Sequence, residues 1–450
     1  MLKQAVTVDR SPVERCALDA PEEVGPQDDP VYRRLCAYRE PGMLAEAFHH
    51  AWPQGSVRGA RLLQTFYNPY SRARGVAEVQ LGGDAPSQLL SLKFFATPER
   101  AKQAYAAALL KPVLPSGGPA VLLLDDRTVA WWLPNGQNLR RIKLCYDTQT
   151  FARYVAKVGL CAPQDAIELP NLIRYVPRRR ALFHWTSPEG RRFYMKFYAA
   201  GASEMPARNL RLLNIADGIG DVGIPKLVRH NRRRAFYIME EIEGVPLTGI
   251  LPHAGAATFT QVGCALAAVH ESRVEPNSKW SDERALRELV AATDELKVAL
   301  PRRRGDIETL VQRLTYERPP VGESKPIHAN LFCDQILVSG SSIGIVDWDD
   351  LACGDPLHDL GRLSAHLIYC SLCGQIDSDC VATYLEALLS AYETAVGSSV
   401  RRDRLRWHIA VELIMRAKIS ALRALPPNWT RYIRDALAAA GQVLNGELCA

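Results

Sequence analysis

Several features that would assign the chain to a membrane, secreted or disulfide-rich class are missing from its sequence. None of its apolar stretches approaches the length needed to span a bilayer, and the N-terminal residues lack the apolar core of a signal peptide. Its 11 cysteines are odd in number and spread over 450 residues, which argues against a disulfide framework. We therefore expect a cytoplasmic protein without a membrane span.

A strong excess of one charge is also missing. The formal net charge is +6, and arginine is concentrated in three short runs, at residues 178–180, 232–234 and 302–304. A basic surface can attract nucleic acid, anionic lipid or phosphorylated substrates. No nucleic-acid-binding motif accompanies these runs, and short arginine runs are typical of solvated turns. Nucleic acid is therefore not the expected partner.

The most informative stretch of the chain runs from residue 325 to residue 367. A polar loop at 328–330 precedes two short apolar runs, at 336–338 and 343–346, whose connection is rich in Ser and Gly and predicts a β-hairpin. The second run ends in the acidic segment 347–350. A loop with amides and a histidine, next to carboxylates at a strand end, has the groups needed to hold Mg²⁺ and phosphate.

This stretch resembles the motifs of the aminoglycoside phosphotransferase/choline kinase-like enzymes, which are relatives of the protein kinases. The catalytic loop of that family reads His-x-Asp, then four residues, then Asn or Gln. Its metal loop is Asp-x-Asp/Glu, followed by Gly-Asp-Pro and a further Asp at the head of a helix. The positions that match in order and spacing are His328, Gln335, Asp347, Asp349, Gly354, Asp355, Pro356 and Asp359. Where the family carries its catalytic Asp, this chain has Asn330.

A second pattern occurs twice in the part of the chain that precedes these motifs. Residues 60–110 and 170–215 each contain a Tyr-x-Pro segment, an arginine, a strand pattern, a lysine followed by aromatic residues, and a helix pattern. The recurring residues are Tyr67, Pro69, Arg72 and Lys93 in the first copy and Tyr175, Pro177, Arg180 and Lys196 in the second. The second copy lies nearer the motifs, so we expect it to be the small lobe and the first to be a cap-like subdomain.

The resemblance implies an α+β, two-lobed, protein-kinase-like fold. The predicted parts are a flexible tail and helical extension at 1–56, a cap-like subdomain resembling a second small lobe at 57–165, and a small antiparallel-sheet lobe at 166–243. A mostly helical large lobe with the catalytic and metal loops follows at 244–450.

The resemblance also implies which small-lobe residues bind ATP. Lys196 would contact the phosphates, Glu204 would orient it, and backbone groups from Met239 to Glu241 would bind the adenine edge. No Gly-rich phosphate loop is present, so Arg180 and its neighbours would contact phosphate through their guanidinium groups. From the residues alone, a solvent-exposed lysine on an edge strand is the better explanation of Lys196. A strand that ends in a polar turn explains the segment from Met239 to Glu241 equally well.

In the large lobe, the resemblance assigns the metal and catalytic roles. Asp347 would ligate Mg²⁺, Gln335 would offer its side-chain carbonyl to the same or a second ion, and Asp349 would join the metal ligands or approach the substrate. His328 is expected to pack beneath the catalytic loop and fix its shape. Asp359 is expected to accept hydrogen bonds from the backbone of that loop.

Asn330 leaves two functional classes open. An amide can orient a hydroxyl but cannot take its proton near pH 7, and general-base catalysis contributes ~10²–10⁴-fold; Asp334 or Asp349 would have to replace the base. One class is an ATP- and Mg²⁺-dependent phosphotransferase (kinase) acting on a hydroxyl of a small molecule, slowed by Asn330. The other is a pseudokinase-like nucleotide-binding or scaffolding protein with a protein partner. Retention of Lys196, Gln335 and Asp347 favours at least nucleotide binding, and Asn330 favours the second class. Because the metal and phosphate groups otherwise match, the enzyme is slightly favoured.

Overall fold

The computed structural model describes residues 25–82, 87–110, 118–135 and 138–447. The predicted flexible tail lies mostly at residues 1–24, outside the described residues. Two short helices, α1 (Pro30–Ala37) and α2 (Met43–Ala51), open the described chain. Asp29 caps α1 by accepting a hydrogen bond from the Val31 amide, and Pro30 stands at the first helical position, where its missing N–H costs nothing.

The first sheet is antiparallel and five-stranded, in the order β1-β2-β3-β5-β4. Its elements are β1 (Val57–Asn68), β2 (Arg72–Leu81), β3 (Gln88–Phe95), α3 (Pro98–Leu109), β4 (Val121–Asp125) and β5 (Thr128–Trp132). Residues alternate between its two faces. One face packs on α1 and α2 through Tyr67 and Phe94, and the other packs on α3 through Phe95 and Trp131. The 3₁₀ helix η1 (Arg140–Tyr146) and α4 (Thr148–Lys157) lead to the second sheet.

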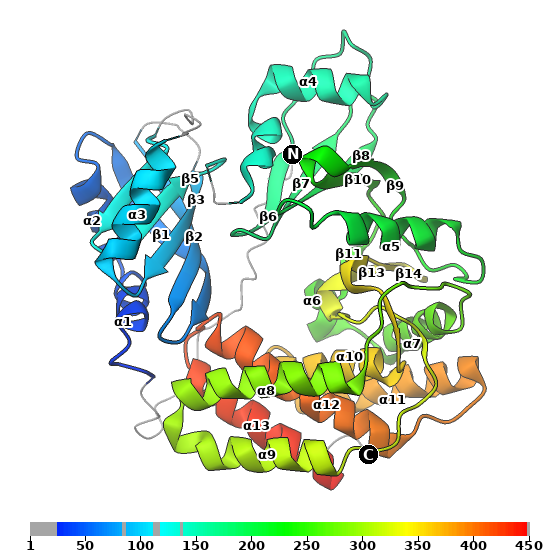
Figure 1. Cartoon of the computed structure of the whole chain (residues 1–450). Helices are drawn as coiled ribbons and strands as arrows, with labels where there is room; N and C mark the ends of the chain where they lie inside the picture. Colours follow the sequence, from blue (N-terminus) through cyan, green and yellow to red (C-terminus); the bar gives the residue numbers. More distant parts are fainter. Residues whose placement is uncertain (1–24, 83–86, 111–117, 136–137, 448–450) are drawn as a thin grey trace.

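The second sheet repeats this topology, in the order β6-β7-β8-β10-β9. Its elements are β6 (Asn171–Val176), β7 (Arg180–Thr186), β8 (Arg192–Tyr198), α5 (Glu204–Ile215), β9 (Leu227–Asn231) and β10 (Phe236–Glu240). Figure 1 shows the first sheet, in blue and cyan, beside the second, in green, with the helical lobe beneath. A shared apolar cluster joins the two sheets, because Val76 and Leu133 of the first unit pack with residues of the second such as Tyr175.

The strand register of the two sheets corresponds around the turn between their first two strands. Tyr67 opposes Ala73 in the first sheet, just as Tyr175 opposes Ala181 in the second. The recurrence predicted from the sequence is therefore present in topology and in strand pairing. The turns between the first two strands also agree, since each holds a non-glycine residue with positive φ: Tyr70 (53°) and Arg178 (68°).

The large lobe is mostly helical. Its helices are α6 (Leu247–Ile250), α7 (Ala256–His270), α8 (Asp282–Ala299), α9 (Arg304–Tyr316), α10 (Leu357–Leu372), α11 (Ser378–Val396), α12 (Arg402–Arg416) and α13 (Trp429–Asn445), with a π-helical turn at Ala417–Leu422. Within the described residues, none of the helices is both long enough and apolar enough to cross a membrane.

Short strands carry the sequence motifs across the top of this lobe. The strands β11 (Val245–Pro246), β13 (Ile336–Ser339) and β14 (Ser342–Ile345) form one small sheet, and β12 (Lys325–Ile327) pairs with β15 (Ala352–Gly354). The predicted hairpin is thus β13–β14. The 3₁₀ helices η5 (Cys333–Gln335) and η6 (Trp348–Asp350) flank it. The predicted α+β class, with an antiparallel small lobe and a helical large lobe, is what the structure shows.

A buried ionic cluster anchors the Gly-Asp-Pro segment to these helices. The guanidinium of Arg404 on α12 is fully buried and donates to Asp355 at 2.7 Å and to Asp282 on α8 at 2.6 Å and 2.8 Å. Removing one member of such a cluster leaves a buried charge without compensation. The cluster therefore fixes where α10 begins, directly after the motif.

Candidate active site

Two cations of the second sheet meet two carboxylates of the β14–η6 loop. Lys196 on β8 donates through its Nζ to Asp347 and, at 2.7 Å, to Asp349. Arg180, the first residue of β7, lies 3.3 Å from both carboxylates. The phenol of Tyr198 donates to Asp349 at 2.8 Å. The loop thus brings a predicted metal ligand against the predicted phosphate contacts, across the boundary between the two lobes.

Burial and charge set the ionisation of this group. Burial of Asp347 opposes its ionisation, but Lys196 and Arg180 hold the pKa of this carboxyl well below its usual range. Burial of Lys196 opposes its charge in turn, and the attraction of Asp347 and Asp349 raises its pKa above the ordinary value. Both partners are therefore fully charged at neutral pH, and the carboxylates are ready to bind a hard cation.

The backbone aims the carboxylates into the site. Asp347 has φ 69°, a left-handed conformation in which Asp and Asn are the most tolerated non-glycine residues. Asn209 on α5 donates its side-chain amide to the carbonyls of Trp348 at 3.1 Å and Asp349 at 3.0 Å. Helix α5 therefore holds the metal loop itself, a contact that no motif in the sequence signalled.

The catalytic loop is held from below by Asp359, as predicted. The amides of His328 and Ala329 donate to its two carboxylate oxygens, at 2.6 Å and 2.9 Å. The His328 ring is buried, packs on Trp348 and contacts the Val346 carbonyl at 3.0 Å. Ala329 has φ 62°, a strained conformation for a residue with a side chain, so this turn depends on the hydrogen bonds to Asp359 that hold it.

We expect Asp359→Asn to loosen this loop. Asn offers one acceptor oxygen where two amides now donate, and a buried unsatisfied donor costs about 1–3 kcal/mol. At pH 7 the free energy of unfolding from urea titration should fall by that amount, whereas Asp379→Asn at an exposed position should leave it unchanged.

The pH dependence gives that variant a second readout. Burial opposes ionisation of Asp359, but the hydrogen bond and charge of His270 outweigh it and lower the pKa to about 2. A depressed carboxyl pKa stabilises the fold above the unfolded value of about 3.9, and this contribution is lost as the pH falls toward about 2. The stability difference between parent and variant should therefore narrow below about pH 4. A difference that stays constant would contradict the assignment.

Asn330 is held between a carboxylate and a guanidinium. Its side-chain amide donates to Asp350 at 3.1 Å, and its carbonyl accepts from Arg362 at 3.0 Å. Arg362 in turn donates to the buried Glu412 at 2.9 Å. Asp350 is exposed at the end of η6. Asn330, at the position where the family carries its catalytic Asp, therefore contacts the solvent-accessible carboxylate of Asp350.

The donor set fits Mg²⁺, which is usually bound by one or two carboxylates and keeps several waters. Asp347 and Asp349 supply carboxylate oxygens. Gln335 is buried, and its backbone carbonyl accepts the amide of Val346, the neighbour of Asp347, at 2.9 Å. Its side-chain Oε1 already accepts the Phe332 amide at 2.8 Å, which leaves one lone pair for another contact. Among the described residues, no group of three or more His, Cys, Asp or Glu side chains is arranged so that it could hold a metal ion.

The structure separates Glu204 from Lys196, the residue that it was predicted to orient. Glu204 begins α5 and pairs with Arg232 at 3.0 Å, whereas Lys196 is oriented by Asp347 and Asp349. The Glu204 carboxylate is half exposed, and this structure does not bring it to Lys196. Glu241 at the strand end accepts from His184 at 2.9 Å.

Sheet pairing and backbone hydrogen bonds leave fewer groups of residues 239–241 available to bind adenine. Met239 pairs within the sheet, opposite residues of β8 and β9. The backbone N–H of Glu240 donates to Lys226 and that of Glu241 to Arg192. These two amide donors are therefore engaged inside the protein, and an adenine edge would have to meet other groups of this segment.

Four residues that the sequence did not mark belong to the site: Tyr198, Asn209, Asp350 and Arg362. Tyr198 follows Lys196 by two residues, so the alternation of side chains along a strand would have placed it on the same face. Asp350 stood beside the metal motif without a motif position of its own. Asn209 and Arg362 reach the site only through the packing of α5 and α10.

Comparison with known proteins agrees with this geometry. Residues 179–402 match the model of a family described as the phosphotransferase enzyme family. The fold is similar to that of a proposed aminoglycoside phosphotransferase from Ralstonia eutropha JMP134, with 16% sequence identity and a TM-score of 0.50 over 67% of this chain and 98% of that one. The predicted protein-kinase-like fold is thereby confirmed.

Two further solved structures show weaker similarity. A choline kinase from Cryptosporidium parvum Iowa II is 13% identical over 67% of this chain and 96% of its own, with a TM-score of 0.48. An amicoumacin kinase, solved with AMP-PNP and Ca²⁺, is 13% identical over 68% and 96%, with a TM-score of 0.46. Among proteins with curated descriptions, none matches the chain by sequence.

Proposed function

We propose that the chain transfers a phosphoryl group from ATP to a hydroxyl of a small molecule, with Mg²⁺ as cofactor, because residues 179–402 match the model of the phosphotransferase enzyme family. The observation that carries the proposal is the meeting of Lys196 and Arg180 with Asp347 and Asp349 across the lobe boundary. In phosphoryl transfer, catalysis is mostly positioning and neutralisation of charge. This contact supports the proposal, because it supplies two cations that suit phosphate and two carboxylates that suit a metal ion.

In this proposal the four charged side chains exchange partners when substrate binds. Asp347 and Asp349, with Gln335, would hold the metal, which neutralises charge on the phosphates when bound. Lys196 and Arg180 would turn from the carboxylates to phosphate oxygens, which they contact through charge-assisted hydrogen bonds. Tyr198 and Asn209 keep Asp349 and its backbone in place during this exchange.

The proton of the attacking hydroxyl needs an acceptor other than Asn330. We assign this role to Asp350, which Asn330 contacts and which is open to solvent. Asp349, one of the bases considered from the sequence, would hold the metal in this proposal and accepts a hydrogen bond from Tyr198. Asp334, the other, lies 3.7 Å from Arg174. Of these three carboxylates, we choose Asp350 because it contacts Asn330, the residue at the family's catalytic Asp position.

One observation favours the second candidate, a pseudokinase-like nucleotide-binding protein. The Asn330 carbonyl accepts from Arg362, and Arg362 is fixed by Glu412, so this loop is stable without a substrate hydroxyl. A protein that only binds nucleotide requires the Lys196–Asp347 group and no base.

ATP binding and ATP consumption by the purified protein test the proposal. Calorimetry should detect ATP binding that requires Mg²⁺, and ADP should form only when an accepted amine, sugar, nucleoside or lipid alcohol is present. Lys196→Met should weaken ATP binding by about 10–100-fold, since a hydrogen bond to a charged group contributes roughly 1.5–3 kcal/mol. Lys143→Met, at an exposed lysine on η1, is the matched control.

The outcomes separate the candidates. Binding together with acceptor-dependent ADP formation supports the phosphotransferase. Binding without transfer to any acceptor leaves the pseudokinase. An equal affinity of parent and Lys196→Met for ATP, at unchanged thermal midpoints, would remove the nucleotide site from this position.

A further inference from the structure

Six cationic side chains gather where the first sheet meets the second. Arg72 and Arg74 alternate along β2 and therefore share a face, and Lys93 on β3 lies directly opposite Arg74. The others come from the β6–β7 turn and from the segment after the π-helical turn, whose Arg423 carbonyl accepts the Tyr67 amide at 2.8 Å. The members of this basic cluster are Arg72, Arg74, Lys93, Arg178, Arg179 and Arg423.

These cations act on one another across the boundary between the sheets. Burial and then the charges of Arg178, Arg74, Arg72 and Arg100 lower the pKa of Lys93 to about 8. Burial and neighbouring arginines likewise lower the pKa of Arg74 to about 10. Like charges on directly opposed strand residues destabilise a sheet. The arrangement is therefore unfavourable as it stands, without an added negative charge.

Carboxylates compensate only one member of the basic cluster. Glu295 pairs with Arg423 at 3.1 Å and is shared with Lys418 at 3.0 Å. For the other five, the part of the chain that the structure describes contains no ion pair with an acid. The Nε of Arg74 is buried and lacks a hydrogen-bond partner among the described atoms. Buried donors are normally satisfied, so an added acceptor would meet a donor that is unpaired among the described atoms.

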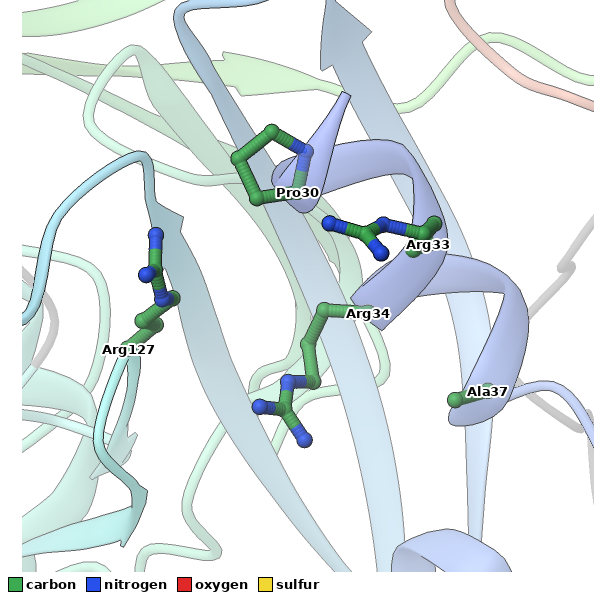
Figure 2. Close-up of a pocket in the computed structure, with 5 residues that line it drawn as sticks. All are labelled: Pro30, Arg33, Arg34, Ala37 and Arg127. Carbon is green, nitrogen blue, oxygen red and sulfur yellow. The ribbon is translucent and has the colours of Figure 1, made fainter. Parts of the chain in front are cut away.

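A nearby pocket shows the opposite arrangement. Figure 2 shows Arg33, Arg34 and Arg127 around a hollow beside α1. There Arg34 and Arg127 are paired with acids, with Asp126 at 3.3 Å and 3.5 Å respectively. Two of the three arginines at that pocket therefore have an acidic partner.

The duplicated topology explains why the basic cluster lies where it does. Lys93 and Lys196 each stand two residues before the end of the third strand of their sheet. Arg72 opposes Phe95 in the first sheet, as Arg180 opposes Tyr198 in the second. Lys93 and Arg72 are thus the positional equivalents of the cations that meet Asp347 and Asp349 in the second sheet. The first sheet keeps the cation pair, but none of the aspartates in the described ranges forms an ion pair with it.

We propose that the basic cluster binds the polyphosphate portion of a small anionic ligand, at a site separate from Lys196 and Asp347. Five cations without acidic partners exceed the charge of one phosphate, and pyrophosphate or tripolyphosphate matches them better. Guanidinium groups bind phosphate oxygens in a bidentate manner, and Lys93 supplies a point charge between them. Arg178 and Arg179 directly precede Arg180, so the ligand would contact the turn that carries this active-site residue.

Calorimetric titration with tripolyphosphate, in EDTA so that no metal complex forms, tests the site. The parent protein should bind, and Arg72→Ser and Lys93→Met should each weaken binding by about tenfold or more, since each removes a charge-assisted contact. Arg58→Ser, an exposed arginine on β1, removes the same charge outside the cluster and should have no effect. Lys196→Met should leave this binding unchanged. Arg72 is exposed, so its variant keeps the test valid if Lys93→Met folds poorly.

Proton uptake gives a readout that surface charge alone does not produce. A bound anion should raise the lowered pKa of Lys93, so binding at pH 8 should take up protons, visible as a buffer-dependent enthalpy. Lys93→Met should abolish this uptake while Arg58→Ser retains it.

Three results would overturn the proposal. One is a parent protein that does not bind tripolyphosphate. Another is binding lost in Lys196→Met but kept in Arg72→Ser and Lys93→Met, which would place the anion in the candidate active site. The third is an oligonucleotide that binds more tightly than tripolyphosphate and loses affinity in the same two variants, which would make the basic cluster a nucleic-acid surface.

Discussion

Asp347→Asn should abolish Mg²⁺-dependent ATP binding. Loss of an outer-shell partner of a metal ligand typically weakens a site by about 10–100-fold, and Asp347 is proposed as a ligand itself, so its loss should cost at least as much. The substitution also removes the charge that holds Lys196 and Arg180. Asn is the appropriate replacement because it tolerates the left-handed backbone at φ 69°, where Ala would add strain.

The measurement is ATP affinity with and without Mg²⁺, compared between the parent and the variant. Asp379→Asn, at the exposed start of α11, serves as the matched control for the loss of one carboxylate. Lys196 keeps Asp349 at 2.7 Å in the Asp347 variant, so a thermal midpoint close to that of the parent is expected. If Mg²⁺ still strengthened ATP binding to the same extent, Asp347 would not be the metal ligand.

Asp350→Asn should lower turnover by ~10²–10⁴-fold, the usual contribution of a general base. Asp350 is the accessible carboxylate that Asn330 holds at 3.1 Å, and ATP affinity should change little because Asp350 lies outside the Lys196 contacts. Initial rates with saturating ATP and acceptor measure the effect. Unchanged turnover in Asp350→Asn would remove Asp350 from the mechanism.

The double variant Asn330→Asp with Asp350→Asn provides the sharpest comparison. It exchanges the amide and the carboxylate while keeping the hydrogen bond between them, and it places the carboxylate at the position used by the family. Turnover should recover relative to Asp350→Asn. Asn330→Asp alone puts two carboxylates in contact, so one of them should have a raised pKa. Its turnover should exceed that of the parent only if the original geometry limits proton transfer.

These variants also decide between the two candidate functions. A pseudokinase binds ATP in every form, and neither the parent nor any of these variants transfers phosphate. A parent enzyme with ordinary turnover that Asn330→Asp leaves unaffected would show that Asn330 is no handicap.

Local sequence patterns determined much of this protein. The apolar runs around 336–346 predicted the hairpin β13–β14, because two short β-branched segments with a Gly/Ser turn have few other stable arrangements. The order of Tyr, Pro, Arg and Lys predicted two related sheets, since strand alternation and turn chemistry act over neighbouring residues. The spacing from His328 to Asp359 predicted the loop that Asp359 anchors.

Tertiary structure alone decided which charged groups meet. Lys196 and Asp347 are 151 residues apart, and Arg180 and Asp349 are 169 residues apart, so their contact depends on how the lobes pack. The same packing turned Glu204 toward Arg232, brought Asn209 onto the metal loop, and placed Arg178 beside Lys93. Strand and helix patterns report the local backbone and the face that is buried, but an ion pair depends on the relative position of two distant surfaces. That position is fixed by the whole core, and no short segment of the sequence contains it.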